Sequence, residues 1–298
     1  RGFTLREPTL VRLDLFRTGD DSHELVWTLH HVVLDGWSGS LVLRDVLTCY
    51  RALRRGQDPR LPAVRPYRDF IEWLGQQDLG RAEAYWRRAL EGAPGAPPSG
   101  GVGGRNGAGA DYAREERLLP AAQLEALRRG ASAARVTLNT LLQGAFALAL
   151  GRSEGQDDVV VGTVSSGRPG ALDGVDGMVG LFVNTLPLRV RLPADAPPGR
   201  WLAELQARQA EQREYEYSPL WDVQRWAGLP PGQRLFESLF VFENYPVDRD
   251  ALSGGDGLSV QVTAPFDRTG YPLMLLATPA EGLKLQLTYD TRRFAAPA

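Results

Sequence analysis

Residues 24–36 read Glu-Leu-Val-Trp-Thr-Leu-His-His-Val-Val-Leu-Asp-Gly, and this stretch decides how the N-terminal third of the chain folds. Up to Leu34 the run is continuous and rich in Val and Leu, which predicts a strand buried on both faces. Leu10–Arg17 alternates apolar and polar residues, and the turn-forming cluster Thr18–Ser22 separates the two runs. The pattern predicts an antiparallel hairpin.

Beyond the hairpin, apolar residues recur at helical spacing from Leu43 to Leu53, and Ser38 or Ser40 is the expected cap of this helix. Pro187 predicts an edge position or a bulge for its strand. The order of the elements predicts an α/β fold with a mixed sheet. Further helices are expected at Tyr67–Leu74, Gly80–Leu90, Pro120–Gly130, Leu138–Leu150 and Arg200–Tyr215, and strands at Arg114–Leu119, Asp158–Val164, Phe182–Val190, Leu235–Phe242, Ser259–Thr263, Tyr271–Thr278 and Leu283–Tyr289.

The composition is that of a globular protein: 43% of the 298 residues are hydrophobic and 23% are charged. Nucleic-acid binding would need a strongly basic face, and the net charge of -2 gives no hint of one. Cys49 is the single cysteine, so the chain cannot form its own disulfide or thiolate zinc site, and we expect a reducing, cytoplasmic location. Leu138–Leu150 is too short and too polar for a membrane span. Because the chain opens Arg-Gly-Phe-Thr, it reads as part of a longer protein.

Residues 92–110 are mostly Gly, Pro and Ala, and they are the expected linker or loop. This divides the chain into an N-terminal part, residues 1–91, and a C-terminal part, residues 111–298. The two parts together are long enough to bury a substantial core.

Two of the three histidines, His30 and His31, fall at the end of the expected strand. Consecutive strand residues point to opposite faces, so the pair cannot easily ligate one metal ion, and no metal site is expected. A histidine at the end of a strand is more often a hydrogen-bonded core residue than a catalyst. Two neighbours favour a catalytic role here. Asp35, four residues on, can fix a turn or a histidine tautomer, and Gly36 lets a ligand approach a helix N-terminus.

No nucleophile accompanies this candidate base. The chain has no Gly-x-Ser-x-Gly elbow, its nearby serines suit helix capping, and Cys49 lies on or near the apolar side of its helix. Chemistry at such a base requires that both reactants come from outside the chain.

His30-His31-Val32-Val33-Leu34-Asp35-Gly36 resembles the HHxxxDG signature of condensation domains of nonribosomal peptide synthetases, within the chloramphenicol-acetyltransferase-like superfamily. Four further segments resemble family motifs in the family's order. They are Tyr67-Arg68-Asp69-Phe70-Ile71-Glu72-Trp73, Ser166-Gly167-Arg168-Pro169, Gly180-Leu181-Phe182-Val183-Asn184-Thr185-Leu186-Pro187-Leu188-Arg189 and Leu235-Phe236-Glu237-Ser238-Leu239-Phe240-Val241-Phe242-Glu243-Asn244-Tyr245.

The resemblance implies an α/β fold of two chloramphenicol-acetyltransferase-like subdomains with mixed sheets, the N-terminal one truncated and the C-terminal one without its closing helix. It implies an acyltransferase-type enzyme that forms an amide bond between two thioester-bound substrates. Their phosphopantetheine arms, carried by upstream and downstream peptidyl carrier domains, enter a tunnel from opposite faces, and an adenylation domain belongs to the same synthetase. The chain itself is expected to bind no cofactor, nucleic acid or membrane.

The resemblance also assigns roles to residues. His31 is the expected catalytic residue, holding the attacking amine and removing its proton, and the N–H of Gly36 is a candidate donor to the oxyanion. His30, Asp35 and Trp37 are expected to be structural. Ser38 and Asn184 are candidate tunnel residues.

Some segments depart from the family pattern. The arginine that usually pairs with the motif aspartate is expected in the absent N-terminal part, which leaves Asp35 without its usual partner. Tyr215–Trp221 stands where the family has HQDxPFE, without the histidine. Two alternatives stay open: an enzyme of the same fold that forms an ester or acylates a free small molecule, and a truncated, non-catalytic fragment or carrier-docking module.

Overall fold

The computed structural model describes residues 2–7, 9–96, 112–193, 195–230, 232–244 and 269–294. These residues fall into two compact units. Unit 1 joins Arg1–Gln76 to Arg168–Val183, and unit 2 joins Gln77–Gly167 to Asn184–Asn244 and to the C-terminal strands. The chain therefore returns to unit 1 after it has entered unit 2. The expected division at residues 92–110, most of which lie outside the described residues, was based on composition. Composition along the chain does not show that a later segment packs with an earlier one, so the units differ from the expected division.

Unit 1 contains an antiparallel hairpin of β1, Val11–Arg17, and β2, His23–Leu29. The expected hairpin is confirmed, but the strand that was expected to reach Leu34 ends at Leu29, because a turn follows. In that turn the N–H of Val33 donates to the carbonyl of His30 at 3.1 Å. The expected burial on both faces is also wrong, since most of β2 is exposed.

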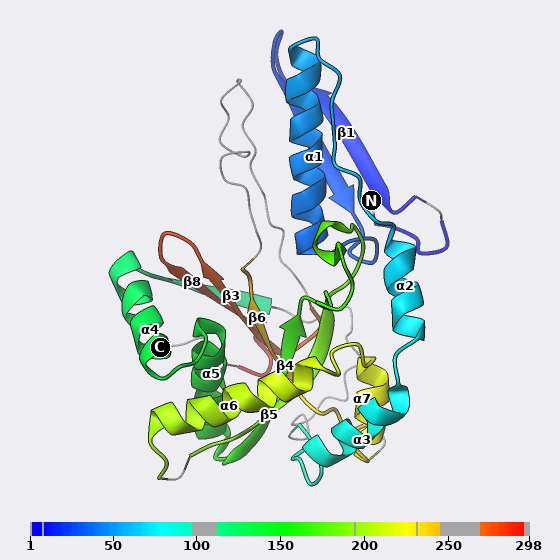
Figure 1. The fold of residues 1–298 in the computed structure, drawn as a ribbon. Coiled ribbons are helices and arrows are strands. Elements are labelled where there is room, and N and C mark those ends of the chain that lie inside the picture. Colours follow the sequence, from blue (N-terminus) through cyan, green and yellow to red (C-terminus); the bar gives the residue numbers. More distant parts are fainter. Residues whose placement is uncertain are drawn as a thin grey trace. The chain divides into compact units, whose positions relative to one another are not determined.

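Helix α1, Gly36–Arg54, follows this turn in unit 1, and α2, Tyr67–Gly75, lies further along (Figure 1). Asp35 caps α1, accepting from the N–H of Ser38 at 2.8 Å. The expected serine cap is therefore wrong. Ser38 supplies the capped N–H, and the Ser40 hydroxyl donates back to the carbonyl of Gly36.

Unit 2 is built on a six-stranded mixed sheet, with strand order β3-β8-β7-β6-β4-β5 (Figure 1). The pairs β4–β6 and β6–β7 are parallel and the others antiparallel, which confirms the mixed α/β class. The edge position expected from Pro187 is confirmed, because β5 ends the sheet. The strands are β3 Tyr112–Leu119, β4 Asp158–Ser165, β5 Asn184–Arg191, β6 Ser238–Phe242, β7 Leu273–Pro279 and β8 Leu283–Asp290.

The sheet of unit 2 packs against helices around two apolar clusters. One contains Phe146 and Phe240, and the other contains Trp86 and Phe236, all nearly inaccessible to solvent. The α7 helix was not expected from the sequence, and the expected strand Ser259–Thr263 lies outside the described residues. The helices are α3 Leu79–Ala89, α4 Ala121–Ala133, α5 Leu138–Glu154, α6 Pro198–Arg213 and α7 Leu220–Trp226.

Within the described residues, no single helix has the length and apolar character to cross a bilayer, although α4 and α5, bent by 97°, meet that criterion as a pair.

Candidate functional site

The Asp35 carboxylate organises the start of α1 from inside unit 1. It is 1% exposed. One oxygen accepts from the N–H of Ser38, and the other accepts from the N–H of Phe182 at 2.9 Å. The Asp35 N–H in turn donates to the carbonyl of Gly180 at 3.2 Å. The first of these hydrogen bonds caps α1, and the other two fix the turn after His31 to the segment around residue 181.

Arg168 supplies the positive charge that neutralises Asp35. The two side chains are 2% and 0% exposed, and Nη2 of Arg168 lies 3.7 Å from Oδ1 of Asp35. Arg168 also donates to the carbonyls of Val175 and Met178, and it stacks on the ring of Phe182 with 3.9 Å from Cζ to the ring centroid. Burial lowers the pKa of Arg168, and the charge of Asp35 opposes that shift.

The expectation that Asp35 lacks a partner is therefore wrong. The cation comes from Ser166-Gly167-Arg168-Pro169, a segment that the sequence singles out as a motif without revealing its role. A charged side chain within a motif next to a buried strand was the available signal, since a fully buried charge requires a partner.

Ser38 completes this buried network. Its hydroxyl donates to the carbonyl of Gly180 at 2.8 Å and accepts from the N–H of Gly180 and from Nη2 of Arg168. The residue is 0% exposed, and all the hydrogen-bonding capacity of its hydroxyl is used. The expected place of Ser38 in a substrate tunnel conflicts with this burial, and the geometry gives it a structural role.

Aromatic residues of α2 support the same segment. The Tyr67 hydroxyl donates to the carbonyl of Leu181 at 2.5 Å, and the rings of Tyr67 and Phe70 pack on Phe182. A Cβ added at Gly180 would overlap the Tyr67 ring, so this close packing requires a glycine there. Burial raises the pKa of Tyr67, and the charge of Asp35 adds to the shift.

His31 lies in the turn between β2 and α1 and is exposed. An imidazole enclosed by packed hydrocarbon would have ruled out a catalytic role, and His31 is not enclosed. His30 is half-buried. Its Nδ1 accepts from the N–H of Val32 at 3.1 Å, and its ring meets Phe3 edge to face. The two histidines therefore differ in environment, although they lie in a turn and not, as expected, in a strand.

Gly36 and Trp37 form the first turn of α1. Gly36 is exposed, and the N–H groups in the first turn of a helix have no acceptor within the helix. The indole of Trp37 donates to the carbonyl of Asp176 at 3.0 Å, which ties the helix start to the rest of the unit. An exposed imidazole and a helix N-terminus thus occur within six residues of one another in the chain.

Asn184 lies in unit 2 at the start of β5. Its amide donates to the carbonyls of Glu216 and Ser218, both at 2.8 Å, which leaves its side-chain oxygen as an acceptor. Ser218 is itself buried and accepts from the indole of Trp86 at 2.9 Å. Burial raises the pKa of Glu216 against the opposing effect of its hydrogen bond with Ser165.

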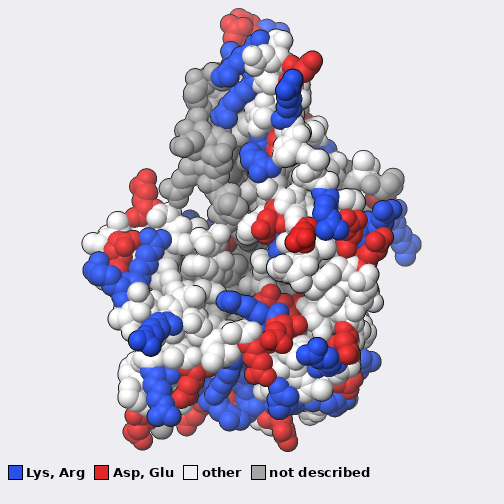
Figure 2. Space-filling model, viewed as in Figure 1, with Lys and Arg blue, Asp and Glu red and all other residues white. Residues whose placement is uncertain are grey.

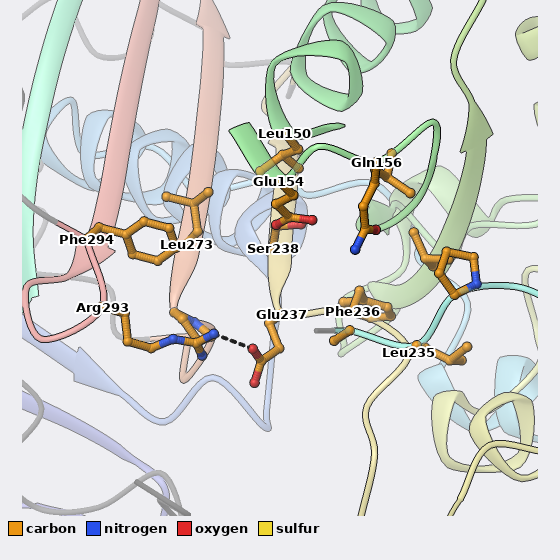
Figure 3. A pocket seen from close by; sticks show the side chains of 16 residues that line it. Leu150, Glu154, Gln156, Leu235, Phe236, Glu237, Ser238, Leu273, Arg293 and Phe294 are labelled. Atoms are coloured by element: carbon orange, nitrogen blue, oxygen red, sulfur yellow. Dashed lines mark hydrogen bonds and ion pairs between the residues drawn. The ribbon is translucent and has the colours of Figure 1, made fainter. Parts of the chain in front are cut away.

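Unit 2 also contains a small hollow of about 40 Å³ that none of the expected site residues lines (Figure 3). Its polar lining includes Glu154, Gln156, Ser238 and the ion pair of Arg293 with Glu237, whose charged atoms are 2.5 Å apart. Burial raises the pKa of Glu154. In the described part of the chain, no three His, Cys, Asp or Glu residues are grouped so that they would hold a metal ion.

Comparison with known proteins matches residues 1–298 to the condensation-domain family. The chain is 42% identical over 303 residues to a linear gramicidin synthase of Brevibacillus parabrevis, covering 100% of this chain and 6% of that protein. It is 41% identical over 295 residues to chondramide synthase cmdD of Chondromyces crocatus, covering 99% of this chain and 8% of that protein. The chain therefore spans a small fraction of the length of these relatives.

Solved structures share the fold at lower identity. The X-domain from teicoplanin biosynthesis superposes with a TM-score of 0.77 at 22% identity, covering 98% of this chain and 69% of that one. The first condensation domain of the calcium-dependent antibiotic synthetase, in complex with a substrate analogue, superposes with a TM-score of 0.72 at 22% identity. The match covers 96% of this chain and 63% of that one. The fold and the family match define the class of protein: this chain belongs to the condensation-domain family.

Proposed function

We propose that this chain forms an amide bond between an acyl or peptidyl thioester and an aminoacyl thioester, with His31 as the catalytic residue. The observation that carries the proposal is the exposed imidazole of His31 in a turn that the buried network of Asp35, Arg168 and Ser38 holds in place. A turn that buried hydrogen bonds fix in place and that carries an exposed imidazole suits the positioning of a reacting group.

In the proposed step the free amine of the acceptor attacks the thioester carbonyl of the donor. The carbon–nitrogen bond forms, the carbon–sulfur bond breaks, and the sulfur leaves as a thiolate that takes up the proton removed from the amine. His31 holds the amine and accepts its proton, and the N–H of Gly36 is the proposed donor to the oxyanion. His30, Asp35 and Trp37 keep the turn and the helix start in place.

The proposed substrates arrive on partners. Phosphopantetheine arms on upstream and downstream peptidyl carrier domains would carry donor and acceptor, and an adenylation domain of the same synthetase would load them. The identity to gramicidin and chondramide synthases supports this assignment. A cytoplasmic location stays a prediction from the cysteine content.

The test is product formation between two loaded carrier proteins in the intact synthetase. Because one positioned proton-transfer group contributes about 10²- to 10⁴-fold to a rate, His31→Ala is expected to lower kcat by a factor in that range. His30→Ala is the matched control. We expect it to lower yield or stability while the soluble fraction keeps its turnover.

An unchanged rate in His31→Ala would remove the assigned role. Loss of turnover in a soluble, normally stable His30→Ala variant would show that His30 takes part in catalysis and that its structural role was assigned wrongly. Efficient competition by a free amine against the carrier-bound acceptor would favour an acyltransferase that uses small-molecule acceptors.

A further inference from the structure

A groove of about 310 Å³ on unit 2 is lined by residues of α3, β5 and α6, four of which are arginines. α3 contributes Arg88, β5 contributes Arg189 and Arg191, and α6 contributes Arg208. Figure 2 shows Lys and Arg side chains, with acidic ones among them, in the lower part of the view, where α3 and α6 lie in Figure 1. Positively charged side chains from α3, β5 and α6 therefore line the same groove.

The groove carries more positive charge than the neighbouring carboxylates neutralise. Asp158 serves both arginines of β5, at 2.7 Å from Arg189 and 3.7 Å from Arg191. Glu211 pairs with Arg88 at 2.7 Å. Two carboxylates are therefore shared among three guanidinium groups.

The fourth arginine, Arg208, is exposed on α6 and has no acceptor among the residues that the structure describes. A second group in the groove also lacks a partner. Tyr85 is 5% exposed and lines the groove, and its hydroxyl forms no hydrogen bond with any described residue. The hydroxyl is not one of the fully buried, unpartnered side-chain atoms of the described residues, so it opens into the groove and is available as a donor to a ligand.

The Tyr85 side chain is held rigidly as a hydrogen-bond donor. Its ring stacks on Tyr215 with centroids 4.3 Å apart and meets Trp86 edge to face. Burial raises the pKa of Tyr85, and the charge of Glu211 adds to the shift, so the phenol keeps its proton. The groove thus presents a fixed O–H donor among guanidinium groups.

We propose that this groove binds a phosphate ester. Guanidinium groups recognise phosphate oxygens by paired hydrogen bonds, and the Tyr85 hydroxyl supplies a further donor. The excess of two positive charges matches a phosphate monoester better than a single carboxylate. The groove is larger than a phosphate group, and its apolar lining offers a surface for the organic part of the ester. That lining consists of Ala89, Leu90, Pro187 and Leu188.

The site is separate from the proposed function, because none of its residues belongs to the His31 turn or to the Asp35 network. Failure of phosphate binding would leave amide formation untouched, and failure of catalysis would leave this site untouched.

The test is calorimetric titration of the full chain with inorganic phosphate, pantetheine 4′-phosphate and adenosine 5′-monophosphate. The last two esters distinguish a flexible organic part from a flat aromatic one. Since a hydrogen bond to a charged group contributes enough to change affinity about tenfold or more, Arg208→Ala is expected to weaken phosphate binding by about that factor. Tyr85→Phe, which removes only the hydroxyl, is expected to weaken it several-fold.

Arg200→Ala is the matched control, because Arg200 is an exposed arginine of the same helix that pairs with Glu204 and does not line the groove. It should leave the dissociation constants unchanged, and thermal unfolding should confirm that every variant is folded. Tighter binding of either ester than of phosphate supports the proposal. It is overturned if none of the three probes binds saturably, if neither ester binds more tightly than phosphate, if succinate binds as tightly as phosphate, or if Arg200→Ala weakens binding as much as Arg208→Ala.

Discussion

Replacement of Arg168 by methionine tests how strongly the stability of the turn after His31 depends on one buried cation. The variant keeps an unbranched side chain but leaves the Asp35 carboxylate, 0% exposed, without its counter-charge. Removing one partner of a buried ion pair costs about 3–5 kcal/mol, because the remaining charge stays desolvated. Asp35 retains its hydrogen bonds from the N–H groups of Ser38 and Phe182, so we expect the lower part of that range.

Hydrogen exchange resolves this loss locally, which matters because a chain of two units need not unfold in one step. The amides of Ser38 and Phe182 both donate to Asp35 and serve as the probes. A loss of about 3 kcal/mol corresponds to roughly 100-fold faster exchange through opening of unit 1.

Arg68→Met is the matched control, since Arg68 forms an exposed pair with Glu72, the two side chains being 78% and 62% exposed. Such surface pairs contribute about 0–1 kcal/mol, so exchange in the control should change less than tenfold. If Arg168→Met exchanged no faster than the control, the buried cation would not hold Asp35, and the turn after His31 would owe its rigidity to other groups.

Two further perturbations test the packing and the buried acid. Gly180→Ala places a Cβ against the Tyr67 ring and is expected to lower the free energy of unfolding, measured in urea, by about 1–3 kcal/mol. Gly170→Ala is the control, because a Cβ there has no atom within 4 Å, and it should lower the free energy far less. Equal effects would contradict the packing argument. Burial raises the folded-state pKa of Glu216 above its ordinary value of 4.5, so stability is lost as the pH rises through that raised pKa. Unfolding measured from pH 4 upward should show this fall in the wild type and a flatter profile in Glu216→Gln; an unaltered profile would refute it.

The sequence predicted the elements of unit 2 well, because its strands and helices have clear periodicity and are separated by turn residues. Phe182–Val190 was correctly expected to be an edge strand or bulged, since Pro187 lacks an N–H for a second neighbour. β2 was overextended to Leu34, because an apolar run continues past the point where the His30 side chain closes a turn. The spacing of apolar residues in the sequence gives no information on a hydrogen bond made by a side chain.

The site was predicted in part. The motif located His31, His30 and Asp35 in the chain, and the structure supports different environments for the two histidines. The partner of Asp35 was missed, because Arg168 is 133 positions away and only the folded chain brings them together. The burial of Ser38 was missed for the same reason, since its acceptor and its donors belong to the distant segment around Gly180.

The discontinuity of unit 1 has a consequence for biosynthesis and for engineering. During translation, Asp35 leaves the ribosome long before Arg168 and Phe182, so the turn bearing His31 matures only after much of the second unit has been made. A chimera joined within residues 92–110 would take these groups from two different parents. Recombination between synthetases is therefore better placed where Asp35 and the loop 168–183 are inherited together.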